Sequence, residues 1–191
     1  NIDVDGVNLN RLAELSSKKI YTFEIDSTCG NALDITTFNR YTNAQRTLSL
    51  SIGAQVMLLV NYDQYVGLIN GSRGIVIDIV NGLPIVKFKT LTITIDYHAW
   101  EVRRDDDKLL GHLYQIPLKL AYAITVHKSQ GLTLDCAYID LKNVFEYGQA
   151  YVALSRVSDS DSLTLVNFDE RSFKAHPSAL SYYEKLENFI A

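Results

Sequence analysis

An alternating run of β-branched residues between positions 74 and 97 predicts an antiparallel sheet in the middle of this chain. Its first half alternates Ile75, Ile77 and Ile79 with Val76, Asp78 and Val80. The dipeptide Asn81-Gly82 comes next, and this is the strongest short-range signal for a two-residue hairpin turn. Pro84 lies near the start of the return strand, where a missing amide donor is tolerated, and residues 91–97 alternate again. Three or more short strands here predict a compact barrel or meander, which we assign to residues 71–112.

The segments on either side of this region show both helical and strand periodicity. Strands are predicted at residues 19–26, 54–61, 137–141 and 162–166, and helices at residues 4–16, 147–157 and 178–190. Pro177 is expected to open the last helix, with Leu180, Tyr183 and Leu186 on its buried side. The connection from the helix at 147–157 to the strand at 162–166 is short, which favours a parallel α/β layer. The overall pattern is therefore α/β with a β insertion.

Composition restricts the class of protein and the cell compartment. With 191 residues and 47% hydrophobic content, the chain can bury one good core and has room for a small second lobe. A formal charge of −4 argues against a general basic surface for nucleic acid, although a local groove can still be basic. Cys29 and Cys136 lack metal-like spacing, which predicts a reduced intracellular chain in the nucleus, mitochondrion or cytoplasm. No apolar run approaches the length of a membrane span, and no signal peptide is visible.

Polar side chains concentrate in the stretch from residue 121 to 135, directly behind an apolar run. Read as a helix, one face would carry Leu120, Ala123, Ile124 and His127, and another Thr125, Lys128 and Ser129. Gly131 is then well placed to end that helix. The polar face would offer donors to phosphates or bases. Ordinary helix-end polarity, with His127 satisfied inside the core, explains the same residues equally well.

The predicted helix at 147–157 combines an apolar stripe with a second, polar face. The stripe consists of Tyr147, Ala150, Tyr151, Leu154 and Val157. Gln149 and Arg156 share the other face, about two turns apart. A guanidinium at this place suits a developing phosphate charge, because it is always protonated and presents a planar fork of donors. An arginine that simply favours the C-terminal end of a helix dipole is the alternative.

Two blocks of sequence resemble motifs of a known helicase family. Residues 125–131 read Thr-Val-His-Lys-Ser-Gln-Gly, and residues 148–156 read Gly-Gln-Ala-Tyr-Val-Ala-Leu-Ser-Arg. In that order, with a strand-sized segment between them, they resemble motifs V and VI of superfamily 1 DNA helicases of the PIF-type and RecD-like branch. The resemblance implies a RecA-like parallel sheet flanked by helices, formed by residues 1–70 and 113–191, with a small Src-homology-like β-barrel inserted at 71–112. Residues 4–8 resemble the segment after the first strand of the second RecA-like domain, so that strand is expected to precede Asn1 and the chain to be part of something larger.

The same resemblance assigns roles to the residues of the two motifs. It implies that Thr125, His127 and Lys128 face the DNA backbone, while Gln130 and Gly131 lie nearer the nucleotide. It further implies that Arg156 senses the γ-phosphate from across the cleft between two RecA-like domains. An arginine finger of this kind stabilises the transition state of phosphoryl transfer.

Two further positions carry a DNA-binding interpretation and a structural one. The resemblance places Asn61 near the nucleic-acid path, whereas spacing alone favours Asn61 and Asn70 as turn residues. Phe88 is flanked by Lys87 and Lys89, a grouping that could stack a base and hold a phosphate. The residues alone favour a core Phe88 between two solvated lysines.

Metal-binding and phosphate-binding motifs are not found in the sequence. Residues 103–108 are a mixed charge run, in which three consecutive aspartates point in different directions, so we predict a solvated loop and no metal site. No G-x-x-x-x-G-K-[ST] motif occurs. The resemblance therefore implies that ATP and Mg²⁺ are bound mainly by a missing N-terminal RecA-like domain, and that these residues alone would not hydrolyse ATP.

The function that the resemblance implies is the C-terminal motor domain of an ATP-dependent 5′–3′ DNA helicase. Its expected partners are single-stranded DNA and the N-terminal RecA-like domain of the same parent chain, with no membrane. One alternative is a helicase-derived module that binds single-stranded nucleic acid without ATPase activity. Another is an unrelated α/β domain, which would fail to bind single-stranded DNA with any salt dependence. A phosphate-binding loop upstream of Asn1 would distinguish the helicase from the module.

Overall fold

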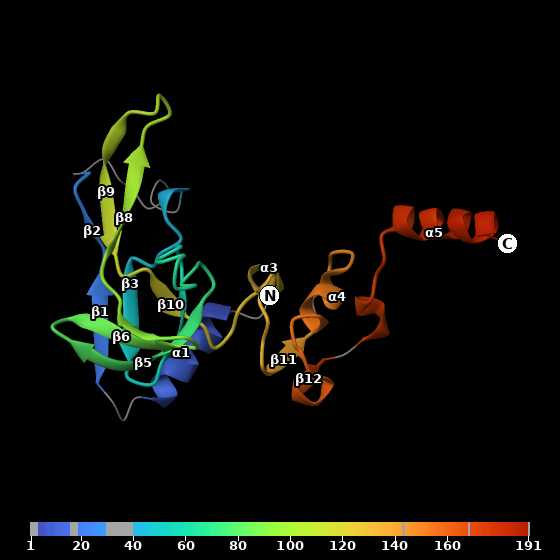
Figure 1. Cartoon of the computed structure of the whole chain (residues 1–191), viewed down its shortest axis with the longest axis horizontal. Helices are drawn as coiled ribbons and strands as arrows, with labels where there is room; N and C mark the ends of the chain where they lie inside the picture. Colours follow the sequence, from blue (N-terminus) through green and yellow to red (C-terminus); the bar gives the residue numbers. More distant parts are fainter. Residues whose placement is uncertain (1–3, 16–18, 30–39, 143, 168, 191) are drawn as a thin grey trace. The chain divides into compact units, whose positions relative to one another are not determined.

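The computed structural model is a mixed α/β structure with several sheets and few helices, and it describes residues 4–15, 19–29, 40–142, 144–167 and 169–190. It divides into two compact units, which we call the first unit (Ile2–Ala123) and the second unit (Ile124–Ala191) (Figure 1). The predicted barrel boundaries, after residues 70 and 112, both fall inside the first unit. The division into a RecA-like domain and an inserted barrel stays a prediction.

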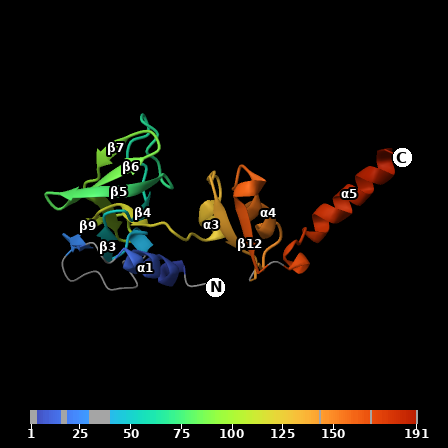
Figure 2. The same ribbon diagram turned by 90° about the horizontal axis from the view of Figure 1, so that it is seen from below.

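Among its described residues, the first unit contains a helix and three antiparallel sheets. Its elements are α1 (Val4–Glu14), β1 (Ile20–Glu24), β2 (Asp26–Ser27), β3 (Thr47–Ser51), β4 (Gln55–Leu58), β5 (Arg73–Val80), β6 (Leu83–Phe88), β7 (Thr92–Thr94), β8 (His98–Arg103), β9 (Leu109–Gln115) and β10 (Leu118–Leu120). The largest sheet has the order β10-β4-β5-β6-β7, and the other two are β1-β3 and β2-β9-β8. Figure 2 shows β5, β6 and β7 side by side.

The hairpin predicted at Asn81-Gly82 is confirmed. Both turn residues have positive φ, 53° and 78°, as a two-residue hairpin turn requires. Val80 pairs with Leu83, so the turn holds these two residues alone. The alternation turns Val76 inward with no exposed surface. The local sequence was therefore sufficient to determine this part of the fold.

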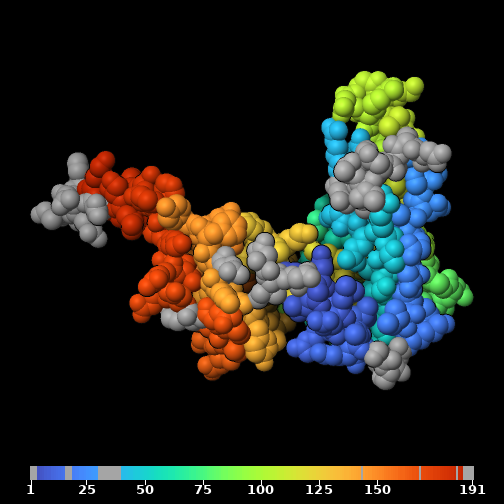
Figure 3. Space-filling model, turned by 180° about the vertical axis from the view of Figure 1, so that it is seen from behind, coloured from blue at the N-terminus to red at the C-terminus, as the bar shows by residue number. Residues whose placement is uncertain are grey.

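The core of the first unit lies between the strands and α1. Leu48, Leu50, Val56 and Leu58 are all fully buried there, and Leu12 of α1 packs against the same cluster. Figure 3 shows α1, in deep blue, lying against the cyan segment that holds β3 and β4. Leu12 of α1 and the buried β strands thus form one contiguous hydrophobic core.

The charge run at residues 103–108 forms the tip of the β8–β9 hairpin, so the predicted loop is confirmed. Arg103 pairs with Glu101 at 2.8 Å, and Arg104 with Asp106 at 3.0 Å, all with exposed side chains. The hydrogen bond from Arg104 holds the pKa of Asp106 below its ordinary value. Opposite charges in this loop therefore neutralise one another locally.

The second unit is built around one parallel pair of strands. Its elements are α3 (Val126–Ser129), β11 (Ala137–Asp140), α4 (Gln149–Leu154), η2 (Ser160–Ser162), β12 (Leu163–Val166), η3 (Glu170–Ser172) and α5 (Pro177–Ile190). β11 and β12 pair in parallel from Ala137↔Leu163 to Asp140↔Val166, which confirms the predicted parallel connection through a helix. Ile139, Leu141, Ala150 and Ala153 form its small core.

The last helix begins at Pro177 as predicted, but its expected buried side is wrong. Leu180, Tyr183 and Leu186 are 54%, 64% and 37% exposed. Helical spacing placed these residues on one side correctly, yet none of them belongs to the described core of the second unit. None of the helices in the described part of the chain combines the length and apolar character needed to cross a membrane.

Candidate functional site

The helix predicted through residues 120–130 is wrong in extent. Leu118–Leu120 is a strand, β10, which pairs with β4 through Leu118↔Leu58. The helix is the single turn α3, and the preceding Thr125 has extended backbone angles of φ −74° and ψ 154°. Pairing with a buried strand outweighs helical periodicity here, because Leu118 and Leu120 lie in the core of the sheet.

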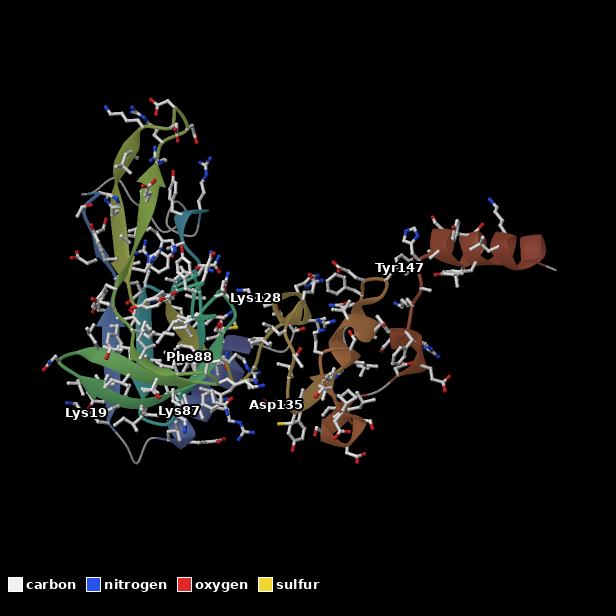
Figure 4. All side chains as sticks on the ribbon, in the orientation of Figure 1. Lys19, Lys87, Phe88, Lys128, Asp135 and Tyr147 are labelled. Atoms are coloured by element: carbon white, nitrogen blue, oxygen red, sulfur yellow. The ribbon has the colours of Figure 1, made fainter. Side chains whose placement is uncertain are left out.

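Both ends of α3 carry capping contacts from motif residues. The Thr125 hydroxyl oxygen accepts from the backbone N–H of Lys128 at 3.4 Å. Gln130 is the C-terminal cap, and Gly131 comes next with φ +78°, which confirms that Gly131 ends the helix. Ser129 is buried, and its hydroxyl donates to the carbonyl of Val126 at 2.7 Å. Thr125 and Lys128 are both exposed, and Lys128 is labelled in Figure 4.

His127 lies at the surface, so the interpretation of a core histidine is wrong. Its side chain is 53% exposed, and its Nε2 is 2.9 Å from Oε2 of Glu146, whose side chain is 51% exposed. A carboxylate accepts hydrogen bonds and cannot donate them, so Nε2 carries the hydrogen in this contact. The partner stands nineteen residues away in the sequence. No local pattern indicated it.

Gln149 anchors the segment that leads into α4. Its side-chain Oε1 accepts from the backbone N–H groups of Phe145, at 3.1 Å, and Glu146, at 3.2 Å. The first residue of motif VI after the glycine is therefore used to hold the Glu146 main chain. Gln149 and Arg156 do not share a helical face, because α4 ends at Leu154 and Ser155 is its cap.

The apolar stripe predicted on this helix is only partly buried. Ala150 and Ala153 are buried at 1% and 4% exposure, whereas Tyr147 and Tyr151 are 54% and 73% exposed. Tyr147 makes an edge-to-face contact with His176, with ring centroids 5.0 Å apart (Figure 4). The small residues, rather than the aromatic ones, face the core.

Arg156 folds back onto the segment after Gly131. Its Nε donates to the carbonyl of Val152 at 3.0 Å, its Nη1 to the carbonyl of Leu132 at 3.4 Å, and its Nη2 to the hydroxyl of Ser155 at 2.9 Å. In return the Leu134 N–H donates to the Arg156 carbonyl at 2.8 Å. The contact with Val152 is the helix-end role that the alternative interpretation describes. The contact with Leu132 is additional, and it brings motif VI beside the Gln130-Gly131 pair of motif V.

Asn61 and Phe88 have the structural roles that their spacing favoured. The Asn61 Oδ1 accepts from the backbone N–H of Asn70 at 2.9 Å, which closes a surface loop. Phe88 is 5% exposed within the core of the first unit, while Lys87 and Lys89 are exposed. A ring packed in the core presents no face to a base, so we remove Phe88 from the DNA-contact set.

The described residues contain no group of three or more His, Cys, Asp or Glu side chains that could hold a metal ion. Glu146 and the carbonyl of Leu132 are the site groups that sequence reasoning missed. Both are reached by contacts between residues 19 and 24 positions apart, which the sequence spacing does not reveal.

Comparisons with known proteins point to one family. The DNA helicase Pif1 2B domain matches residues 35–79. The ATP-dependent DNA helicase PIF1 of Danio rerio is 40% identical over 188 residues, which is 96% of this chain and 29% of that protein. A crystal structure of Pif1 helicase from Candida albicans matches with a TM-score of 0.83 and 29% identity, over 96% of this chain and 47% of the other. A Bacteroides Pif1 helicase in complex with ADP-AlF3 and single-stranded DNA matches with a TM-score of 0.76 and 30% identity, over 97% of this chain and 43% of the other.

This chain spans less than half the length of each of these proteins. Within that span the two motif blocks, the sequence identity and the fold agree. The chain belongs to the PIF-type family of superfamily 1 DNA helicases and corresponds to a C-terminal region of its members.

Proposed function

We propose that this chain is the C-terminal motor region of an ATP-dependent DNA helicase that moves 5′ to 3′ along single-stranded DNA. The observation that carries the proposal is the contact of the Arg156 guanidinium with the Leu132 carbonyl, which joins the end of motif VI to the glycine end of motif V. The names of the matching proteins support it, since they are ATP-dependent DNA helicases, and one was crystallised with ADP-AlF3 and single-stranded DNA.

We further propose that the second unit is part of a RecA-like layer. The parallel pair of β11 and β12 with α4 between them in sequence is one repeat of such a layer. The antiparallel strands from β5 to β9 would then form the inserted Src-homology-like barrel. Its hairpins supply the short strands that a small barrel requires.

The chemistry of Arg156 fits a nucleotide phosphate. Each terminal nitrogen of a guanidinium has two N–H groups, and each of those in Arg156 uses one of them in a contact within the chain. The second N–H of each is available for a phosphate oxygen, and the existing contacts hold the fork in place. Gln130 and Gly131, on the adjacent segment, complete the proposed nucleotide side.

ATP with Mg²⁺ supplies the phosphoanhydride bond whose hydrolysis drives translocation. We propose that both are held mainly by the N-terminal RecA-like domain of the parent protein. Arg156 would then act as an arginine finger, because its fixed charge stabilises the phosphate charge that develops in the transition state.

The proposed DNA side consists of exposed residues around α3. Lys128 offers an ammonium group. The Thr125 hydroxyl can still donate its hydrogen, because it acts as an acceptor in its contact among the described residues. His127 stands between them on α3. Asn61, in the first unit, is proposed as a separate DNA contact through the family resemblance, and its Oδ1 closes its own loop.

The test is Arg156→Ala in the full-length protein that contains this sequence. We expect ATP turnover with single-stranded DNA to fall by roughly 10³-fold or more, the scale of an arginine-finger contribution, while the dissociation constant for DNA changes little. Arg171→Ala, an exposed arginine of the same unit, is the matched control and should leave turnover unchanged. Normal turnover in Arg156→Ala would refute the finger. A wild-type protein that binds single-stranded DNA but hydrolyses no ATP would favour the binding module instead.

A further inference from the structure

Two separate contacts join the segment around α3 to the segment around α4 within the second unit. The first, which we call the Arg156 contact, runs from Arg156 to the main chain of Leu132 and Leu134, at the C-terminal end of α4. The second, which we call the Glu146 contact, runs from His127 on α3 to Glu146, just before α4. The chain segments around the two short helices are therefore connected at both ends of α4.

The Glu146 contact continues into the main chain at the start of α4. The Glu146 carboxylate accepts a hydrogen bond from Nε2 of His127. The backbone N–H of Glu146 donates to the side-chain oxygen of Gln149 at 3.2 Å. Gln149 is the first residue of α4, and Arg156 comes shortly after its end. A displacement of His127 therefore has a contiguous path of hydrogen bonds and helical backbone to Arg156.

α3 depends on such contacts for its position. It has only four residues, whereas helix formation is unfavourable until several turns have formed. Its capping bonds define its shape, and Val126 packs against the small core that includes Ala150 and Ala153 of α4. The Glu146 contact is a side-chain bond from α3 to the α4 segment, and it joins the proposed DNA side to the proposed nucleotide side.

The chemistry of the pair also explains why an acidic side chain lies beside residues proposed to bind a polyanion. Glu146 cannot contact DNA phosphates favourably, because both are negatively charged. The Nε2 hydrogen of His127 is used in the contact with the Glu146 carboxylate, so that hydrogen is not available to a phosphate oxygen. The pair thus directs His127 toward α4 and leaves the phosphate contacts to Thr125 and Lys128.

We propose that Glu146 is a positioning residue that couples DNA binding at α3 to the nucleotide side at Arg156, acting through His127 and Gln149. This rests on the proposed function, since it assigns those two sides. When DNA engages Thr125 and Lys128, α3 shifts, and the Glu146 contact transmits the shift to the start of α4. By thermodynamic linkage, nucleotide binding must then change DNA affinity by the same factor as DNA changes nucleotide affinity.

The experiment measures this coupling in the full-length protein. The dissociation constant of a labelled oligo-dT is determined by fluorescence anisotropy with and without ADP and aluminium fluoride, and the ratio of the two constants is the coupling. In Glu146→Ala we expect the ratio to move toward unity by about threefold to tenfold, with the melting temperature unchanged, since exposed ion pairs contribute little to stability. Glu146→Gln keeps an oxygen acceptor for Nε2 and should retain most of the coupling.

The double variant His127→Ala/Glu146→Ala tests whether the two residues act as a unit. Its coupling should equal that of either single variant, because one removal already breaks the path. Asp106→Asn is the matched control: Asp106 forms an exposed ion pair of 3.0 Å with Arg104 in the first unit, and its loss should leave the ratio unchanged.

Three results would overturn the inference. An unchanged ratio in Glu146→Ala would do so, and so would additive losses in the double variant. A His127→Ala protein that loses DNA affinity equally with and without nucleotide would show that His127 is a direct DNA contact. If the DNA affinity of the wild-type protein were the same with and without nucleotide, the proposed function itself would be contradicted. Failure of the inference and failure of the proposed function are therefore distinguishable.

Discussion

The side-chain amide of Asn8 holds the main chain of Ala123 through two hydrogen bonds. The Asn8 Nδ2 donates to the Ala123 carbonyl at 3.0 Å, and the Ala123 N–H donates to the Asn8 Oδ1 at 2.8 Å. Asn8 is 6% exposed and lies on α1. A helix at the start of the first unit's sequence therefore holds the main chain at the end of that unit's sequence. Because both amide atoms are used, no other side chain of similar size reproduces the pair.

Asn8→Ala should therefore destabilise the first unit by about 2–3 kcal/mol, because it leaves one main-chain donor and one acceptor without their partners. Hydrogen exchange of the β4 and β10 amides in the full-length protein measures the change in opening free energy. Asn10→Ala on the same helix removes an exposed asparagine and should cost much less. Equal effects of the two substitutions would contradict the role given to Asn8.

Gln115 performs a similar function inside the core of the first unit. It has no exposed surface, its Nε2 donates to the carbonyls of Phe23 and Gln45 at 3.0 Å each, and its Oε1 accepts from the Ile116 N–H at 2.9 Å. Gln115→Leu preserves the volume but removes these bonds, and we expect a loss of roughly 2–4 kcal/mol. The same hydrogen-exchange measurement checks it, with Gln64→Leu as the exposed control. A loss no larger than that of the control would show that the core tolerates an apolar residue here.

Two substitutions of Phe88 distinguish a core role for this ring from a DNA-binding role. Since it is 5% exposed, Phe88→Ala should cost the first unit about 3–5 kcal/mol through the cavity that it leaves. Phe88→Leu should retain most of that stability and bind oligo-dT with the wild-type dissociation constant. If Phe88→Leu folded normally but bound DNA markedly more weakly, base stacking by this ring would have to be reconsidered.

His98 gives the first unit a dependence on pH. Burial lowers the pKa of His98 from its ordinary value of 6.5. The His98 ring lies edge-to-face with the Trp100 ring, with ring centroids 4.6 Å apart. The folded chain therefore binds this proton less readily than the unfolded chain does, so stability is fully present above the unfolded value and is lost as pH falls below it. The melting temperature should fall between about pH 7 and about pH 5.5, and His98→Gln should flatten part of that fall. Identical pH profiles for the two proteins would exclude His98 as the cause.

Features that depend on a few neighbouring residues could be predicted from the sequence. The Asn81-Gly82 turn needs positive φ at both positions, and Gly131 ends α3 for the same local reason. The extent of α3 could not be predicted, because β10 exists only through its pairing with β4, far away in the sequence. Helical periodicity at 118–124 and strand pairing compete, and the buried pairing prevails.

The candidate site was predictable in its residue types but not in its contacts. Arg156 and Gly131 could be named from their motifs, since a fixed charge and a flexible turn have recognisable chemistry. Glu146 could not, because a surface glutamate has no pattern of its own and its partner His127 is nineteen residues away. The same holds for Tyr151, whose helical spacing was right but whose side chain faces solvent.

The salt dependence of DNA binding provides a test of Lys128 that does not depend on ATP. Each phosphate neutralised by a lysine releases counterions, so the logarithm of affinity falls linearly with the logarithm of salt concentration. If Lys128 contacts one phosphate, Lys128→Ala should reduce the magnitude of that slope by about one, and weaken binding to all sequences alike. Lys185→Ala, an exposed lysine on α5, is the matched control. Because these 191 residues carry a net charge of −4, their own contribution to DNA binding must rely on local cations rather than on a general field. An unchanged slope in Lys128→Ala would therefore contradict DNA binding at α3. It would also remove the basis for the proposed coupling between α3 and Arg156.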